Sequence, residues 1–185
     1  PAVEAINGTI SSGPLSGIGF WEARLNEGRR ITAVGGSDNH DPGLEGARGV
    51  GTPTTVVRAD NLSQDAILAG IRAGHVFVDV AGTGERRLEV TAHAAGRSAG
   101  MGDVLAVPPD EDVRVEIRVA GVSGGRIEFR GDPKLIPLPP IPVPEGEGVV
   151  TVAIAGAGAA RWFRADVRGP DGKLWLLGNP IYFGP

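Results

Sequence analysis

The chain has 185 residues, of which 41% are hydrophobic and 22% are charged, a composition typical of a globular protein with a sizeable core. Its net charge is −4 and it has no basic run, so we expect no electrostatic face for nucleic acid. The absence of cysteine excludes disulfides and thiolate metal sites. No apolar stretch is long enough to span a bilayer, and no pattern assigns a compartment.

The first part of the chain alternates between strand and helix patterns. The predicted order is strand 2–6, helix 15–26, strand 31–34, strand 54–57, helix 63–74 and strand 75–78. Ile18, Trp21 and Leu25 recur at helical spacing in the first helix. Ser63 is a good N-cap for the second helix, and Gly74 is a good stop. This alternation predicts a parallel α/β unit.

The clearest candidate chemistry follows strand 31–34, in the segment Gly-Gly-Ser-Asp-Asn-His-Asp-Pro at 35–42. Asp38 and His40 are two residues apart, so in an extended backbone their side chains point to the same side. A carboxylate and an imidazole could then reach one metal ion, at the strand end where α/β proteins bind ligands. The alternative is an ordinary turn, since Asn and Asp are common turn residues.

The second part of the chain changes to a period of two. The predicted strands are 88–93, 113–119, 127–130, 150–154, 163–168, 174–176 and 181–183. With no helix between them, they predict a small antiparallel β-sandwich. In strand 163–168 the predicted inner face is Phe163, Ala165 and Val167, and the outer face is Arg164, Asp166 and Arg168.

Two further features have competing interpretations. Six prolines between residues 132 and 148 suit either a polyproline ligand or a stiff loop between sandwich strands, and we favour the loop. Trp162, Trp175 and Tyr182 suit either an aromatic sugar-binding platform or core packing, and we favour packing.

The order of several short motifs gives a resemblance to a known family. The motifs are 3–8, Trp21 with 25–30, 36–41, 51–57 and 69–74, followed by 101–103, 162–168 and 179–182. In these segments the chain resembles the C-terminal end of a PHP (polymerase and histidinol phosphatase) metallohydrolase domain. The match is to the branch that includes carbaryl-hydrolase-like proteins, in which a sandwich tail follows the barrel.

The resemblance implies an α/β plus all-β fold. It would consist of a partial PHP-type (β/α) barrel over residues 1–82 and an antiparallel β-sandwich over 83–185. The family's last metal-binding motif maps onto Asp38 and His40, in a site that holds two or three zinc, manganese or iron ions. The implied reaction is metal-assisted hydrolysis of a small phosphate ester or related ester. Arg48 is the candidate contact for an anionic substrate group, with an exposed loop arginine as the alternative.

The chain departs from the family pattern because the early His-x-His pair, the middle glutamate and the later histidines are absent. We expect His75 at the surface and His93 on the polar face of a strand, so neither replaces them. The chain begins at Pro1, and we expect it to be a fragment that is inactive alone and lacks the N-terminal part of the barrel.

Two expectations complete the sequence interpretation. Strand edges left exposed by an incomplete barrel would favour oligomerisation. The alternative function is a non-catalytic β-sandwich that binds a partner or acts as a scaffold.

Overall fold

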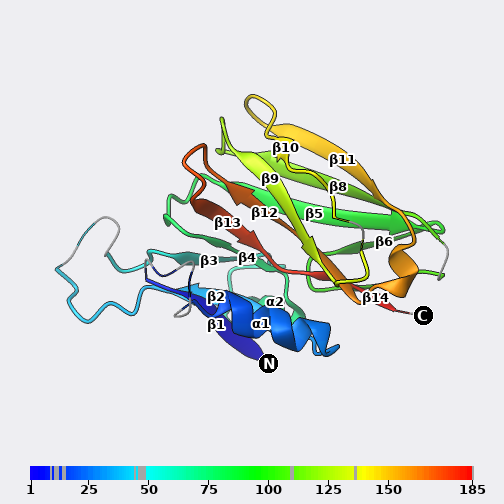
Figure 1. Cartoon of the computed structure of the whole chain (residues 1–185). Helices are drawn as coiled ribbons and strands as arrows, with labels where there is room; N and C mark the ends of the chain where they lie inside the picture. Colours follow the sequence, from blue (N-terminus) through cyan, green and yellow to red (C-terminus); the bar gives the residue numbers. More distant parts are fainter. Residues whose placement is uncertain are drawn as a thin grey trace.

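The computed structural model describes residues 1–8, 10, 13, 16–43, 45, 49–108, 111–135 and 137–184, and in this part of the chain strands predominate over two α-helices (Figure 1). The elements are β1 (Ala2–Asn7), α1 (Ile18–Asn26), β2 (Thr32–Gly36), β3 (Thr54–Val57), α2 (Gln64–Ala73), β4 (Val76–Asp79), β5 (Arg87–Ala94), β6 (Arg97–Gly100), β7 (Val104–Ala106), β8 (Val113–Ala120), β9 (Arg126–Gly131), β10 (Ile141–Pro142), β11 (Gly148–Ile154), η2 (Ala157–Ala159), β12 (Trp162–Arg168), β13 (Leu174–Gly178) and β14 (Ile181–Gly184). None of the helices in the described ranges has the length and apolarity needed to cross a membrane.

Two sheets face each other and enclose the larger core, which makes the chain rich in β-sandwich structure (Figure 1). The smaller sheet has the order β11-β8-β5-β6 and is antiparallel. In β8 the alternation is complete: Val113, Val115 and Ile117 are fully buried, whereas Arg114 and Arg118 are exposed. The period-two pattern therefore predicted β5, β8 and β11 and their inner faces correctly, but it did not predict β6.

The larger sheet has the order β10-β9-β12-β13-β4-β3, with β14 paired to β12 and, in parallel, to β7. Here β3 and β4 run antiparallel, so the parallel pairing expected from their alternation with α2 is wrong. The amide of Arg58 donates to the carbonyl of His75, which shows that α2 returns the chain to the strand end it left. The sheet also joins strands from both sides of residue 82, where the sequence suggested a division.

A small parallel unit lies on the other side of the larger sheet. It consists of β1 and β2, which are joined by α1 and paired in parallel as predicted (Figure 1). The predicted helix over 15–26 is described from Ile18 onward. A Cβ atom on Gly17 would collide with the carbonyl oxygen of Glu4, so glycine lets the helix begin directly against β1.

A second core fills the space between this parallel unit and the larger sheet. Its buried members are Ala5, Ile6, Trp21, Leu25, Ala33, Val78, Trp162, Leu174, Leu177 and Tyr182. Trp162 and Tyr182 thus pack in a core, as favoured from the sequence, and Trp175 is half-buried against the larger core. The larger sheet is consequently covered on both faces along β12 and β13.

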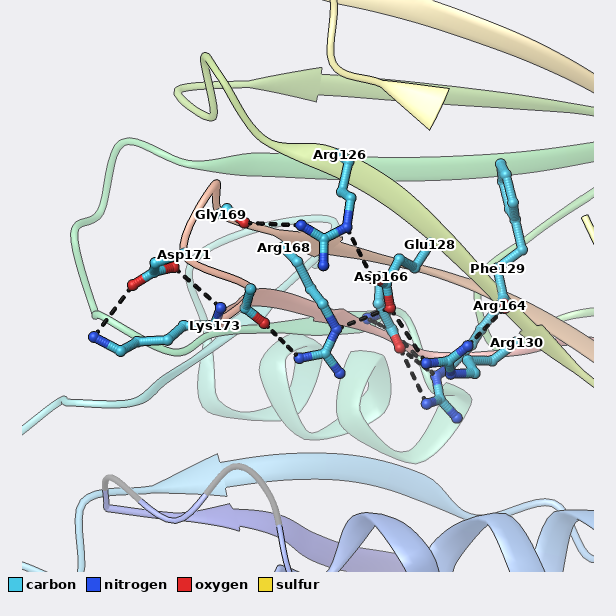
Figure 2. A network of polar contacts seen from close by, with 12 residues as sticks. Arg126, Glu128, Phe129, Arg130, Arg164, Asp166, Arg168, Gly169, Asp171 and Lys173 are labelled. Carbon is cyan, nitrogen blue, oxygen red and sulfur yellow. Dashed lines mark hydrogen bonds and ion pairs between the residues drawn. The ribbon is translucent and has the colours of Figure 1, made fainter. Parts of the chain in front are cut away.

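The second core corrects the expected outer face of strand 163–168. Arg164 and Asp166 are 1% and 3% exposed, because α1 lies over this face of β12. Nε of Arg164 donates to Asp166 at 3.0 Å (Figure 2). Nη2 of Arg164 donates to Glu22 of α1 at 2.6 Å. The guanidinium also stacks over Trp21 at 4.8 Å. Burial by itself lowers the pKa of Arg164, but the two carboxylates outweigh burial and the net pKa is raised.

Two local predictions are confirmed by backbone geometry. Ser63 caps α2 by accepting from the amide of Ala66 at 3.2 Å, and Gly74 ends the helix with a φ of +80°.

The proline-rich segment connects β9 to β11, forms β10 on the way, and places Leu135 and Leu138 against the larger core. These contacts favour the stiff-loop interpretation of the prolines.

Candidate functional site

The segment after β2 brings together the two residues that the sequence singled out. Nε2 of His40 and Oδ1 of Asp38 are 3.1 Å apart. The His40 side chain is 87% exposed and that of Asp38 is 58% exposed. The pair is therefore open to solvent and lies just beyond the carboxyl end of β2, as predicted.

Close packing of two glycines fixes the strand end that carries this pair. A Cβ on Gly35 would lie 2.6 Å from Cγ1 of Val78, and one on Gly36 would lie 2.6 Å from Oε1 of Glu4. The Thr55 hydroxyl both accepts from the Gly35 amide at 2.9 Å and donates to its carbonyl at 2.8 Å. The end of β2 is thus held between β1, β3 and β4.

The backbone turns sharply at the site itself. Asp38 has a φ of +48°, which a residue with a side chain seldom adopts and which is enriched at functional positions. Beyond it, Oδ1 of Asn39 accepts from the Asp41 amide at 2.6 Å, and Oδ1 of Asp41 accepts from the Gly43 amide at 2.9 Å. These successive Asx turns hold the short polar run after Asp38 in a compact conformation.

The pair has the donor chemistry of two ligands of one metal ion. Bonds from zinc to imidazole nitrogen and carboxylate oxygen are about 2.0–2.2 Å, so two ligands of a tetrahedral ion are separated by roughly 3.3–3.6 Å. The two donor atoms lie 3.1 Å apart, at hydrogen-bond distance, so a small movement of the side chains would bring both to one ion. Within the described ranges, however, no group of three or more His, Cys, Asp or Glu residues could hold a metal ion. Asp38 and His40 fit part of a metal site and not a complete one.

Two polar residues that sequence reasoning missed lie at the same edge. Glu4 and Asn7 belong to β1, and Asn7 pairs in register with Gly36. Nδ2 of Asn7 donates to Oε2 of Glu4 at 3.0 Å, which leaves the Glu4 carboxylate beside Gly36. The signal that could have found Asn7 is its place at the end of a strand parallel to β2, because the carboxyl ends of parallel strands share one edge, whereas Glu4 lies three residues earlier in β1.

The two other histidines lie elsewhere. Nε2 of His75 is 2.8 Å from Oδ1 of Asp103, and its side chain is 25% exposed. His93 is on the polar side of β5, with its Nε2 3.8 Å from Oε2 of Glu116. Each faces one carboxylate in its own part of the fold, so neither adds to the Asp38–His40 pair. Arg48, the predicted substrate contact, lies outside the described residues.

Comparisons with known proteins find no matching family model, curated protein or solved structure. The PHP resemblance therefore stays a hypothesis, and the argument for function depends on the geometry of the site.

Proposed function

We propose that Asp38 and His40 are two ligands of a transition-metal centre in a metal-dependent hydrolase of the PHP type. The observation that carries the proposal is the 3.1 Å separation of their donor atoms at the carboxyl end of a parallel strand. The missing ligands would come from a segment outside this chain, in keeping with the two-ligand set. The unit β1-α1-β2 would then be the last part of a (β/α) barrel, followed by its sandwich tail.

The chemistry follows from the nature of the two donors. A bound zinc, manganese or iron ion would activate water for attack on a phosphate ester or related ester. His40 would bind through a neutral nitrogen, so its hydrogen bond with Asp38 would give way to coordination of both side chains. Asp38 would add the negative charge that holds a divalent ion. Since two ligands alone bind weakly, we expect no turnover by the 185-residue chain.

Manganese binding by this chain is the first test. In NMR spectra, substoichiometric Mn²⁺ should broaden the amide signals of residues 36–41 before those of any other segment. Asp38→Asn and His40→Gln should each remove the effect, whereas Asp60→Asn, at an exposed loop aspartate, should retain it. Equal broadening in the two site variants would refute the ligand assignment.

Turnover distinguishes the hydrolase from the alternative, a non-catalytic sandwich module. The alternative is supported by the larger core, which the strands of the sandwich enclose without the parallel unit. In a protein that carries this chain together with the missing ligands, Asp38→Asn should abolish metal-dependent phosphoesterase or carbamate-esterase activity. Full activity in that variant would favour the module.

A further inference from the structure

Three arginines surround the carboxylate of Glu128 on the face of β9 and β12, next to buried Arg164 (Figure 2). Nε of Arg126 is 3.0 Å from Oε1, Nε of Arg168 is 2.8 Å from Oε2, and Nη2 of Arg130 is 3.2 Å from Oε2. Glu128 itself is 13% exposed. These three guanidinium groups and one carboxylate carry a formal charge of +2, and the adjoining Arg164, Asp166 and Glu22 add −1, which leaves +1 in a chain whose net charge is −4.

The register between β9 and β12 places like charges directly opposite each other. Arg126 is directly opposite Arg168, and Glu128 is opposite Asp166. Like charges placed directly opposite each other in a sheet are destabilising. Glu128 bridges the two arginines, since each of its oxygens accepts from one of them, yet one negative charge cannot balance both. Arg126 and Arg168 together with Glu128 therefore keep one positive charge, which a further anion could balance.

Both guanidinium groups of the pair keep donor atoms that the described part of the chain does not use. Nη1 of Arg126 donates to the carbonyl of Gly169 at 3.2 Å, and Nη1 of Arg168 donates to that of Gly172 at 3.0 Å. With Nε on Glu128 and Nη1 on the turn, both guanidinium groups are fixed. Their Nη2 atoms make no hydrogen bond within the described part of the chain, and each carries two N–H donors. The side chains are 37% and 25% exposed, so a ligand can approach them.

We propose that Arg126 and Arg168 form a binding site for a phosphate group with two negative charges. Such a group offsets the excess positive charge beside Glu128, and its oxygens are the acceptors that guanidinium forks prefer. Glu128 stays in place as the residue that orients the two arginines. Lys173 and Asp171 in the neighbouring turn pair with each other at 3.2 Å and leave the balance unchanged. The site shares no residue with the Asp38–His40 pair.

Titration of the 185-residue chain with inorganic phosphate tests the proposal. At constant ionic strength, phosphate should give saturable NMR shifts of the Nε–Hε signals of Arg126 and Arg168. Acetate and chloride should give none. A phosphoserine peptide is the second arm: tighter binding than inorganic phosphate would identify a phosphorylated protein segment as the source of the group, and equal binding would identify a small phosphate.

Charge-preserving variants separate a built site from a diffuse positive field. Arg126→Lys and Arg168→Lys each keep the charge but lose one Nη2 fork, so each should weaken phosphate binding at least about tenfold. Arg114→Lys is the matched control. Arg114 belongs to β8 of the smaller sheet and lies 2.6 Å from Glu116 of the same strand. This variant should leave the affinity unchanged. Absence of saturable shifts, equal affinity for acetate, or full affinity in a folded lysine variant would overturn the proposal.

Discussion

The polar faces of β8 and β12 have nearly the same sequence pattern and opposite surroundings. Each strand places an acidic residue between two arginines at alternate positions: Arg114, Glu116 and Arg118 on β8, and Arg164, Asp166 and Arg168 on β12. On β8 the two arginines are 55% and 65% exposed, whereas Arg164 is 1% exposed. The difference teaches that alternation identifies the polar face of a strand but not whether another element covers that face.

Replacing the buried arginine of β12 and an exposed arginine of β8 should give the largest difference between the two strands. We expect Arg164→Ala to lower the free energy of unfolding by about 3–5 kcal/mol, because Asp166 would stay buried without its partner. Arg114→Ala should change the free energy of unfolding by no more than about 0.5 kcal/mol, since its ion pair is exposed. Urea denaturation of the two variants measures both values. Equal losses would show that burial under α1 does not matter.

The same comparison explains how much of the fold the sequence could predict. Alternation and turn residues identify strands because they depend on neighbours in the chain, so β5 and β8 were predicted with their inner faces. Cover of β12 depends on Trp21 and Glu22, more than 140 residues away from Arg164 along the chain. The direction of β3 relative to β4 depends on where α2 returns the chain, which periodicity does not encode.

In the candidate site, as in the fold, the sequence predicted the features that depend on neighbouring residues and not those that depend on strand pairing. Asp38 and His40 are close in sequence, so their spacing and the preceding strand were enough to pair them. Glu4 and Asn7 reach the same edge only because β1 pairs with β2, so no local pattern marks them. The arginine pair of the larger sheet was equally hidden, because it depends on the register between β9 and β12.

Stability at alkaline pH should depend on Tyr182, which is buried on the covered side of the larger sheet. Burial raises the pKa of Tyr182 to about 12, while its hydroxyl accepts from the Ile31 amide at 3.2 Å. An unfolded chain ionises this tyrosine near its ordinary pKa of 10.0. The stabilising contribution is therefore complete below pH 10 and is lost as the pH rises toward 12, by about 2–3 kcal/mol.

The variant Tyr182→Phe isolates this contribution. It should be less stable than the wild type at pH 8, because it loses the contacts with Ile31, and its free energy of unfolding should fall less between pH 10 and 12. Chemical denaturation across that range measures the two slopes. Parallel slopes would mean that Tyr182 is not held in its neutral form by the fold.

Glu128 gives the smallest effect and tests the part of the β9–β12 face that α1 leaves open. Burial favours a higher pKa for this carboxyl, but Arg168, Arg126 and Arg130 outweigh burial and the net pKa lies below the ordinary 4.5. Its contribution to stability is therefore complete above pH 4.5 and is lost as the pH falls through the lowered pKa. Glu128→Gln should cost about 1 kcal/mol at pH 7, because Arg126 and Arg168 would face each other without a bridging charge. The gap between the variant and the wild type should narrow as the pH falls through the lowered pKa of Glu128, because the wild-type side chain then becomes neutral like that of glutamine. A gap that stays constant over the whole acid range would mean that Glu128 contributes its shape and not its charge.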